Sequence, residues 1–243
     1  MATLKNKATY LLESVPRIAG GGVDGAAPES ITCYFEVGHP LWYMRGFKYV
    51  GADETGAPLF ADYDADGNLI GTTNDPHDED FTDIGSGIPD VTYGITLNAE
   101  YKGIDLTIFG SGAAGNDVFY GLYRENYVNI AKGIYDDFKS GKFCDASKAD
   151  ANPKFWRSSA MVYDGSYFKI KQIQLGYTLP KSITQKFFVE NLRAYISLDD
   201  FFTFTSYPGL DPETTTQSHN RLGLDRGAYP TMKKMVFGVS VTF

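Results

Sequence analysis

The last eleven residues of the chain, 233–243, restrict its fold more than any other stretch. Side chains of an extended strand alternate between two faces. The apolar face here carries Met235, Phe237, Val239, Val241 and Phe243, and the opposite face, small and polar apart from Val236, carries Lys234, Gly238, Ser240 and Thr242. A transmembrane β-strand needs about 9–11 residues with this alternation. The last strand of a soluble sandwich would alternate in the same way, so the stretch leaves both interpretations open.

Composition favours β structure and narrows the choice of partners. Of 243 residues, 15% are aromatic and 26 are glycine, which suits pleated surfaces and tight turns. The net charge of −8 argues against a nucleic-acid partner, because phosphate binding needs a basic patch. No apolar run reaches the roughly 18 residues of a transmembrane helix, but barrel strands are only half apolar and need no such run.

The clearest local pattern after the terminus is a hairpin at residues 91–112. Apolar residues alternate with polar ones on both sides of the dipeptide Lys102-Gly103, which predicts two antiparallel strands joined by a two-residue turn. Tyr93 and Tyr101 stand at the two ends of the first apolar face. Aromatic residues in these places are typical of the interfacial girdles of a membrane barrel.

Further strands bring the predicted total to about seven. Alternation or aromatic content predicts strands at residues 31–37, 42–50 and 192–204. A strand at 166–177 changes phase near Lys171-Gln172, and one extra residue there, a β-bulge, would return its five apolar residues to one face. Those five are Phe168, Ile170, Ile173, Leu175 and Tyr177. In a membrane barrel, the long segments 51–89 and 111–157 would be extracellular loops, and Lys102-Gly103 would be a short periplasmic turn.

One acidic turn resembles the first half of a calcium-binding loop. Asp62, Asp64, Asp66 and Asn68 place side-chain oxygens at alternate positions around a glycine. The twelfth position, which should be a bidentate Glu, is Thr73. An Asp/Asn/Gly-rich surface turn is the alternative, and we expect weak or absent calcium binding.

Nothing in the sequence indicates an enzyme or a bound cofactor. The histidines, at 39, 77 and 219, are scattered, and no nucleophile, metal-ligand or phosphate-binding motif is present. Cys33 and Cys144 fit no metal spacing; they could pair in an oxidising compartment, and the sequence leaves this open. Trp42 and Trp156 could stack on sugar rings, or they could be interface anchors or loop-packing residues.

Several stretches, in order along the chain, resemble the C-terminal barrel of SusC/RagA-type TonB-linked outer-membrane transporters. The three longest are residues 164–180, 202–213 and 227–230. Shorter ones lie upstream, at residues 37–40, 62–67, 84–85, 93–94 and 115–117. Together they extend the resemblance over nearly all of residues 2–243.

This resemblance implies an all-β fold: an antiparallel transmembrane β-barrel segment, roughly seven strands of a larger barrel, with long extracellular loops. Residues 1–243 would form the C-terminal part of a TonB-dependent receptor barrel. The plug domain and signal peptide, N-terminal in the family, have no counterpart here, so the fragment alone is not expected to transport. The location would be the outer membrane of a Gram-negative cell.

The resemblance also implies partners and cargo. They are membrane lipid, TonB, a SusD-like surface lipoprotein, and an oligosaccharide or peptide to be imported. The alternative is a soluble β-sandwich that binds carbohydrate or another ligand. The two differ in where the apolar side chains lie: outward in a barrel, and against a second sheet in a sandwich.

Overall fold

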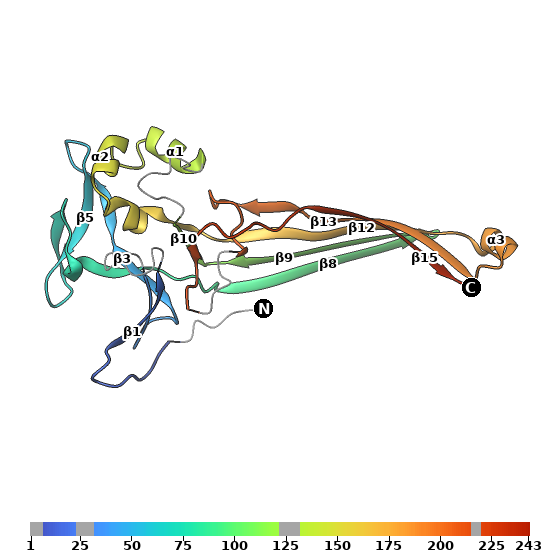
Figure 1. The fold of residues 1–243 in the computed structure, drawn as a ribbon, viewed down its shortest axis with the longest axis horizontal. Coiled ribbons are helices and arrows are strands. Elements are labelled where there is room, and N and C mark those ends of the chain that lie inside the picture. Colours follow the sequence, from blue (N-terminus) through green and yellow to red (C-terminus); the bar gives the residue numbers. More distant parts are fainter. Residues whose placement is uncertain (1–6, 23–31, 122–131, 215–219) are drawn as a thin grey trace.

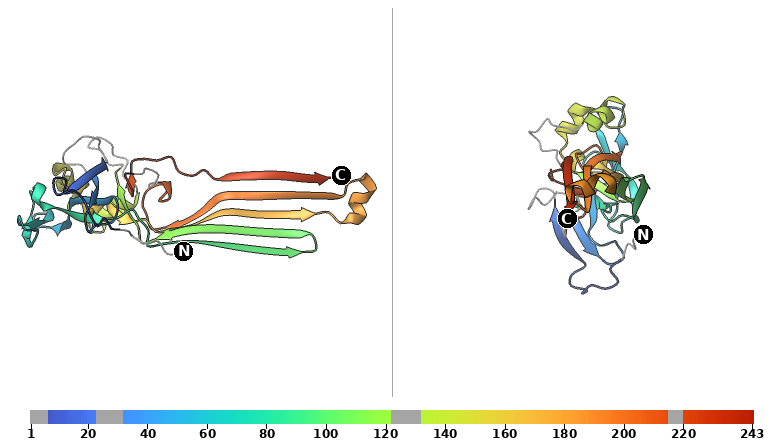
Figure 2. Two further views of the ribbon diagram at one scale, coloured as in Figure 1. Left: turned by 90° about the horizontal axis from the view of Figure 1, so that it is seen from below. Right: turned by 90° about the vertical axis from the view of Figure 1, so that its right-hand side faces the viewer.

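The computed structural model describes residues 7–22, 32–121, 132–214 and 220–243. A long antiparallel sheet extends from a head of short strands and helices, and the C-terminus lies near the end of the sheet that is remote from the head (Figures 1 and 2). No helix of the described residues is both long and apolar enough to cross a membrane.

The long sheet contains five strands in the order β15-β13-β12-β9-β8, each antiparallel to its neighbours. They are β8 (Val91–Tyr101), β9 (Ile104–Ala114), β12 (Tyr167–Thr178), β13 (Asn191–Thr205) and β15 (Lys234–Thr242). The predicted all-β antiparallel fold and the predicted hairpin are confirmed. In the described part of the chain the sheet stays open, with β8 and β15 at its edges, as expected of part of a larger barrel.

Strand register collects the apolar residues of all five strands on one face. Partners in neighbouring antiparallel strands share a face. One row across the sheet consists of Leu97, Ile108, Ile173, Leu198 and Met235, and the next consists of Ala99, Leu106, Leu175, Ile196 and Phe237. Leu97 is 61% exposed and Phe237 73%, so these side chains are not covered by another part of the described chain. The face therefore differs from the inner face of a sandwich.

The predicted β-bulge lies where the sequence placed it. Ile170 pairs with Gly110 and Gln172 with Phe109, which leaves Lys171 as the extra residue of β12 relative to β9. Strand β13 has a further extra residue at the same level, because Asp199 pairs with Gln172 and Phe202 with Ile170. The bulge in β12 keeps its five apolar residues on the same face.

The head is built from three small sheets. The first contains β1 (Arg17–Gly22), β2 (Thr32–Glu36), β3 (Tyr43–Phe47) and β7 (Phe81–Gly85). The second contains β4 (Tyr49–Ala52), β5 (Pro58–Tyr63) and β6 (Leu69–Thr73), and the third β10 (Asp117–Tyr120), β11 (Val162–Asp164) and β14 (Leu224–Asp225). The helices of the head are η1 (Asp78–Asp80), α1 (Lys132–Lys139), α2 (Ala146–Ala151), η2 (Phe155–Arg157) and η3 (Ser159–Met161). Two further short helices, α3 (Lys181–Thr184) and η4 (Gln185–Phe187), lie at the end of the long sheet remote from the head (Figure 1).

Three sequence predictions change here. The strand expected at 42–50 is two strands, β3 and β4, which belong to different sheets, so five of the seven predicted strands lie in the long sheet and the others in the head. The segment 111–157, predicted as a loop, contains β10, α1, α2 and η2. The segment 51–89, also predicted as a loop, contains β5, β6 and β7. The strands of this segment have 5 or 6 residues each and lack a regular alternation of burial, which is why no pattern revealed them.

The head has its own aromatic core. Phe47, Phe60 and Phe155 are at most 1% exposed, and Trp156 packs against Phe155 and Phe138. Both cysteines lie in this core as free thiols. Burial raises the pKa of Cys33 to about 12 and that of Cys144 to about 11, so both thiols stay protonated at neutral pH.

Glycines in β9 make room for an aromatic row across the sheet near the head. Tyr93 stacks on Phe168 with ring centroids 5.9 Å apart, and Phe168 stacks on Phe204 at 6.4 Å. A Cβ at Gly110 would lie 2.5 Å from the Phe168 ring. The row is therefore possible only because β9 has no side chain there.

We expect Gly110→Ala to destabilise the sheet, because the Phe168 ring must leave its stacked position. Overpacking of this kind costs about 1–3 kcal/mol. Gly94→Ala is the matched control, since its Cβ would meet its nearest neighbour at an ordinary 3.6 Å. Urea denaturation of the full chain measures both, and equal midpoints for the two variants would contradict the role of Gly110.

Candidate functional site

The second face of the long sheet is polar. Its uncharged residues include Thr96, Asn98, Thr107, Gln174, Ser197 and Ser240, with Phe109, Tyr195 and Val236 as apolar exceptions. Arg193 and Asp105 form an ion pair on this face, with Arg193 Nε 2.9 Å from Asp105 Oδ1. The pair passes over Gly176 of the strand between them, where a Cβ would lie 2.4 Å from the guanidinium. Such a face suits a water-filled interior.

A buried lysine joins this polar face to the connection between β13 and β15. Lys169 is 2% exposed, and its Nζ donates to Asp211 Oδ2 and to Glu213 Oε2, each at 2.8 Å. The Asp211 carboxylate also accepts from the backbone N–H groups of Glu213 and Thr231. The connection is therefore held on the sheet by charge-assisted hydrogen bonds, which are stronger than neutral ones.

The two bulges extend this network. Lys171 is 2.6 Å from Glu213 Oε2 and 3.3 Å from Asp200 Oδ1, so the extra residues of β12 and β13 contact each other. Asp200 has a φ of 57°, in the left-handed region that a non-glycine residue rarely occupies. A cavity of about 400 Å³ opens beside the network and is lined in part by Lys169, Asp200 and Asp211.

Sequence patterns did not reveal this network, because its partners are 42 and 44 residues apart. One signal was available. Lys169 and Lys171 lie in the first of the three longest stretches that carried the family resemblance, and Asp211 and Glu213 lie in the second. The structure brings these two stretches into contact.

We expect Lys169→Met to lower the free energy of unfolding by about 3–5 kcal/mol, because it leaves buried carboxylates without their cation. Gln174→Met, on the same strand and face, is the control and should change stability by less than about 1 kcal/mol. Urea midpoints of the full chain measure both. A Lys169→Met chain as stable as the control would show that the network contributes nothing.

The same network predicts a dependence of stability on pH. Burial alone would raise the pKa of Asp211 and Glu213, but hydrogen bonds from Lys169, and from Lys171 to Glu213, outweigh burial and hold both pKa values below normal. A depressed pKa stabilises the fold above the unfolded-state pKa, about 4, and this contribution disappears as the pH falls through the folded-state value. The difference in urea midpoint between wild type and Lys169→Met should therefore narrow between about pH 5 and pH 3. A constant difference would contradict this assignment.

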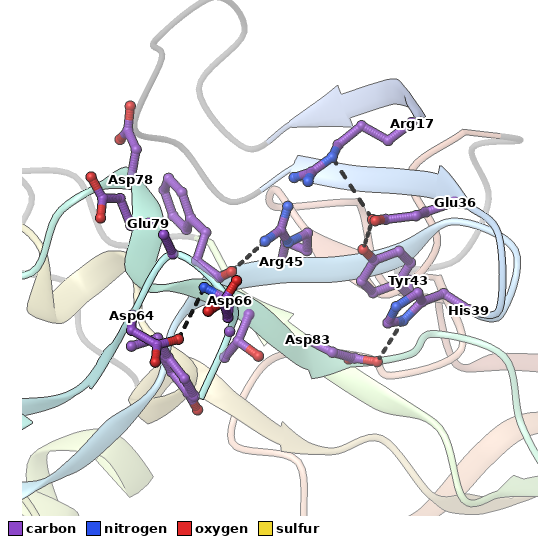
Figure 3. A pocket seen from close by; sticks show the side chains of 15 residues that line it. Arg17, Glu36, His39, Tyr43, Arg45, Asp64, Asp66, Asp78, Glu79 and Asp83 are labelled. Carbon is purple, nitrogen blue, oxygen red and sulfur yellow. Dashed lines mark hydrogen bonds and ion pairs between the residues drawn. The ribbon is translucent and has the colours of Figure 1, made fainter. Parts of the chain in front are cut away.

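The head contains a larger polar pocket of about 800 Å³ (Figure 3). Its charged and aromatic lining includes Arg17, Glu36, His39, Tyr43, Arg45, Asp64, Asp66, Asp78, Glu79 and Asp83. These residues come from β1, β2, β3 and β7, from the turn after Glu36, from η1 and from the turn between β5 and β6. Four separate segments of the chain therefore have to fold before the pocket exists.

Contacts within the pocket fix several of these side chains. Tyr43 donates to the Glu36 carboxylate, and Arg45 donates to the carbonyl oxygen of Phe81. His39 stacks on Tyr43 with centroids 4.2 Å apart, and its Nδ1 lies 3.4 Å from Asp83 Oδ2. Burial, and then the hydrogen bond to Glu36, raise the pKa of Tyr43, so its hydroxyl stays a donor. The pocket offers fixed acceptors, guanidinium donors and aromatic rings.

The calcium-like residues lie around the turn between β5 and β6. Asp64 Oδ1 accepts from the backbone N–H groups of Asp66 and Asn68, at 3.0 and 2.8 Å, and these bonds lower the Asp64 pKa. Asp62 lies within β5, where it pairs with Gly71. Across the described residues, no group of three or more His, Cys, Asp or Glu side chains could hold a metal ion. Weak or absent calcium binding by Asp62, Asp64, Asp66 and Asn68 stays a prediction.

The tryptophans and histidines lie in different places. Trp156 is 7% exposed inside the head core, which is the loop-packing role. Trp42 is half-buried against Phe35, with ring centroids 6.0 Å apart. His39 lies in the polar pocket, His77 precedes η1, and His219 lies outside the described residues.

Comparison with known proteins gives consistent sequence relatives. TonB-dependent receptor P3 of Formosa agariphila is 29% identical over 202 residues, 79% of this chain and 20% of the receptor. TonB-dependent receptor SusC of Bacteroides thetaiotaomicron is 25% identical over 215 residues, 84% of this chain and 20% of SusC. The chain thus spans about a fifth of the length of these relatives. No family model matches it.

Solved structures share the fold. The RagAB peptide transporter has a TM-score of 0.72 and 23% identity, covering 97% of this chain and 26% of the transporter chain. RagAB in its closed-closed state gives the same TM-score at 22% identity. The fold of nearly the whole chain is therefore that of part of such a barrel protein.

The sequence relatives and the structural neighbours belong to the same kind of protein. TonB-dependent receptors are β-barrel proteins of the outer membrane, which agrees with the predicted location of this chain. The resemblance of the chain to SusC/RagA-type TonB-dependent receptors is confirmed, and the chain is similar to a part of them.

Proposed function

We propose that this chain forms the C-terminal part of the barrel wall, together with outer loops, of a TonB-dependent transporter. The transporter imports oligosaccharides or peptides across the outer membrane with a SusD-like surface lipoprotein. The observation that carries the proposal is the two-faced long sheet, apolar and exposed on one side and polar on the other.

An exposed face of this kind suits lipid and is costly in water. Apolar surface in water costs about 25 cal/mol per Å². The strands of the long sheet have 9 to 15 residues, enough to cross the hydrocarbon layer. Within the sheet each strand satisfies its neighbours' backbone groups, as a lipid environment requires. In a soluble sandwich this face would lie against a second sheet.

The open edges bear on transport by the chain alone. The outer edges of β8 and β15 have no partner strand among the described residues, and unpaired edges are not stable in hydrocarbon. In the proposal, further wall strands of a longer protein pair with both edges. Transport, with energy passed on by TonB, then belongs to that longer protein.

The head would lie outside the cell. The two longest connections of the sheet, from β9 to β12 and from β13 to β15, lie at the head end. The two-residue turn Lys102-Gly103 and the shorter connection from β12 to β13, which contains α3 and η4, lie at the other end (Figures 1 and 2). The polar pocket is then a candidate contact for cargo, since its acceptors, guanidinium groups and stacked ring pair suit hydroxyl or peptide groups. RagAB is named a peptide importer, which makes a peptide one of the two cargo classes. In this proposal the chain has no catalytic role.

Spin labels on the two faces test the proposal. Single cysteines replace Leu97 and Phe237 on the apolar face, and Thr96 and Ser240 on the polar face of the same two strands. Each variant is labelled in outer membranes. The protein without an added cysteine, which contains only the buried Cys33 and Cys144, gives the background signal. We expect high oxygen and low nickel-chelate accessibility at the first pair, and the reverse at the second. Labels at Leu97 and Phe237 that exclude both reagents would indicate a sandwich core and overturn the proposal.

A further inference from the structure

Two adjacent phenylalanines are strongly exposed at the end of the molecule opposite the head. The connection between β12 and β13 contains α3 and η4, and Phe187 and Phe188 lie at the C-terminal end of η4. Phe187 is 71% exposed and Phe188 92%, and Ile183 in α3 is 45% exposed. Such exposure of large apolar side chains on neighbouring positions marks an interaction surface.

The backbone of this turn is strained at the more exposed ring. Phe188 has a φ of 57°, in the left-handed region that is costly for a residue with a bulky side chain. Its N–H donates to the carbonyl oxygen of Gln185, which closes η4. Strained positions persist where the surroundings impose them, and they often mark a role beyond folding. The strain and the exposure coincide at the same residue.

The turn adjoins the end of the long sheet that is remote from the head. Glu190 N–H donates to the carbonyl oxygen of Thr242 at 2.8 Å, and Thr178 N–H donates to that of Gly103 at 2.7 Å. The turn, the C-terminus and the β8–β9 hairpin therefore meet at one end of the sheet, and Figure 1 shows α3 beside the C-terminus. Three further aromatic side chains at this end are exposed, namely Tyr101 at 68%, Tyr177 at 43% and Phe243 at 88%.

Exposed lysines lie at the same end. Lys102 belongs to the hairpin turn, and Lys181 and Lys186 belong to α3 and η4. Glu100 and Glu190 are exposed there too, so the local charge is close to balanced, whereas the head pocket is mostly acidic. Aromatic rings next to lysines are typical of the boundary between hydrocarbon and lipid headgroups.

We infer that residues 180–190 form a membrane-interface anchor, with Phe187 and Phe188 embedded among phospholipid headgroups on the side opposite the head. This inference rests on the proposed function, because it needs the apolar face to lie in lipid. The anchor would set how deeply the sheet sits in the bilayer. It would also remove Phe188 from water, since interfacial segments bury Phe side chains at the boundary between headgroups and acyl chains.

A spin label at residue 188 tests the anchor. Phe188→Cys is labelled in the full protein in outer membranes, and oxygen and nickel-chelate accessibilities are compared with those at two other sites. Phe237→Cys reports the hydrocarbon, and Leu69→Cys reports an apolar residue of the head that is 65% exposed. We expect the ratio of oxygen to nickel accessibility at 188 to fall between those of the two references, with nickel accessibility several-fold below that at 69.

Each other result has a separate meaning. Nickel accessibility at 188 equal to that at 69 places the turn in water and overturns the anchor. Exclusion of both reagents at 188 indicates a protein partner and also overturns it. In both cases a label at 237 that stays oxygen-accessible leaves the proposed function intact. A label at 237 that lacks high oxygen accessibility would instead overturn the proposed function.

Discussion

An uncovered apolar sheet face is the constraint on which this structure depends. It needs a neighbour that is itself apolar, and hydrocarbon is one that also forbids unpaired backbone groups. The demand for paired backbone groups is met inside the sheet, where β9, β12 and β13 pair on both sides. The head can be irregular because it does not share this constraint, and its short strands are stabilised by an ordinary aromatic core.

Glycine allows the long side chains of both faces to pack across neighbouring strands. On the apolar face, Gly110 and Gly112 lie beneath the rings of Phe168 and Tyr93. On the polar face, Gly176 lies beneath the pair formed by Arg193 and Asp105. A strand that would otherwise separate its neighbours' side chains thus lets them interact directly. Side chains of two strands that are not adjacent can therefore contact each other across the strand between them.

The sequence predicted the parts of this fold that depend on local alternation. The terminal strand, the hairpin at Lys102-Gly103 and the bulge at Lys171 all follow from a period of two and its interruption. The head did not follow from any period, because its short strands are fixed by contacts between distant segments, such as the hydrogen bond from the Tyr49 N–H to Ser159 Oγ, 110 residues further along the chain. The site was predictable only in part for the same reason: the partners of Lys169 lie more than 40 residues away, and the pocket draws on four segments.

The successive bulges have a consequence for how such a wall can vary. At one level of the sheet β9 passes directly from Phe109 to Gly110, β12 accommodates Lys171, and β13 accommodates two residues, Asp200 and Phe201. Register is regular again on either side of this line, so the apolar rows above and below are undisturbed. An inserted residue can thus add charge to the inner surface without moving any side chain of the outer one. Sequence change along this line could alter what the interior attracts while the protein keeps the same fit to its membrane.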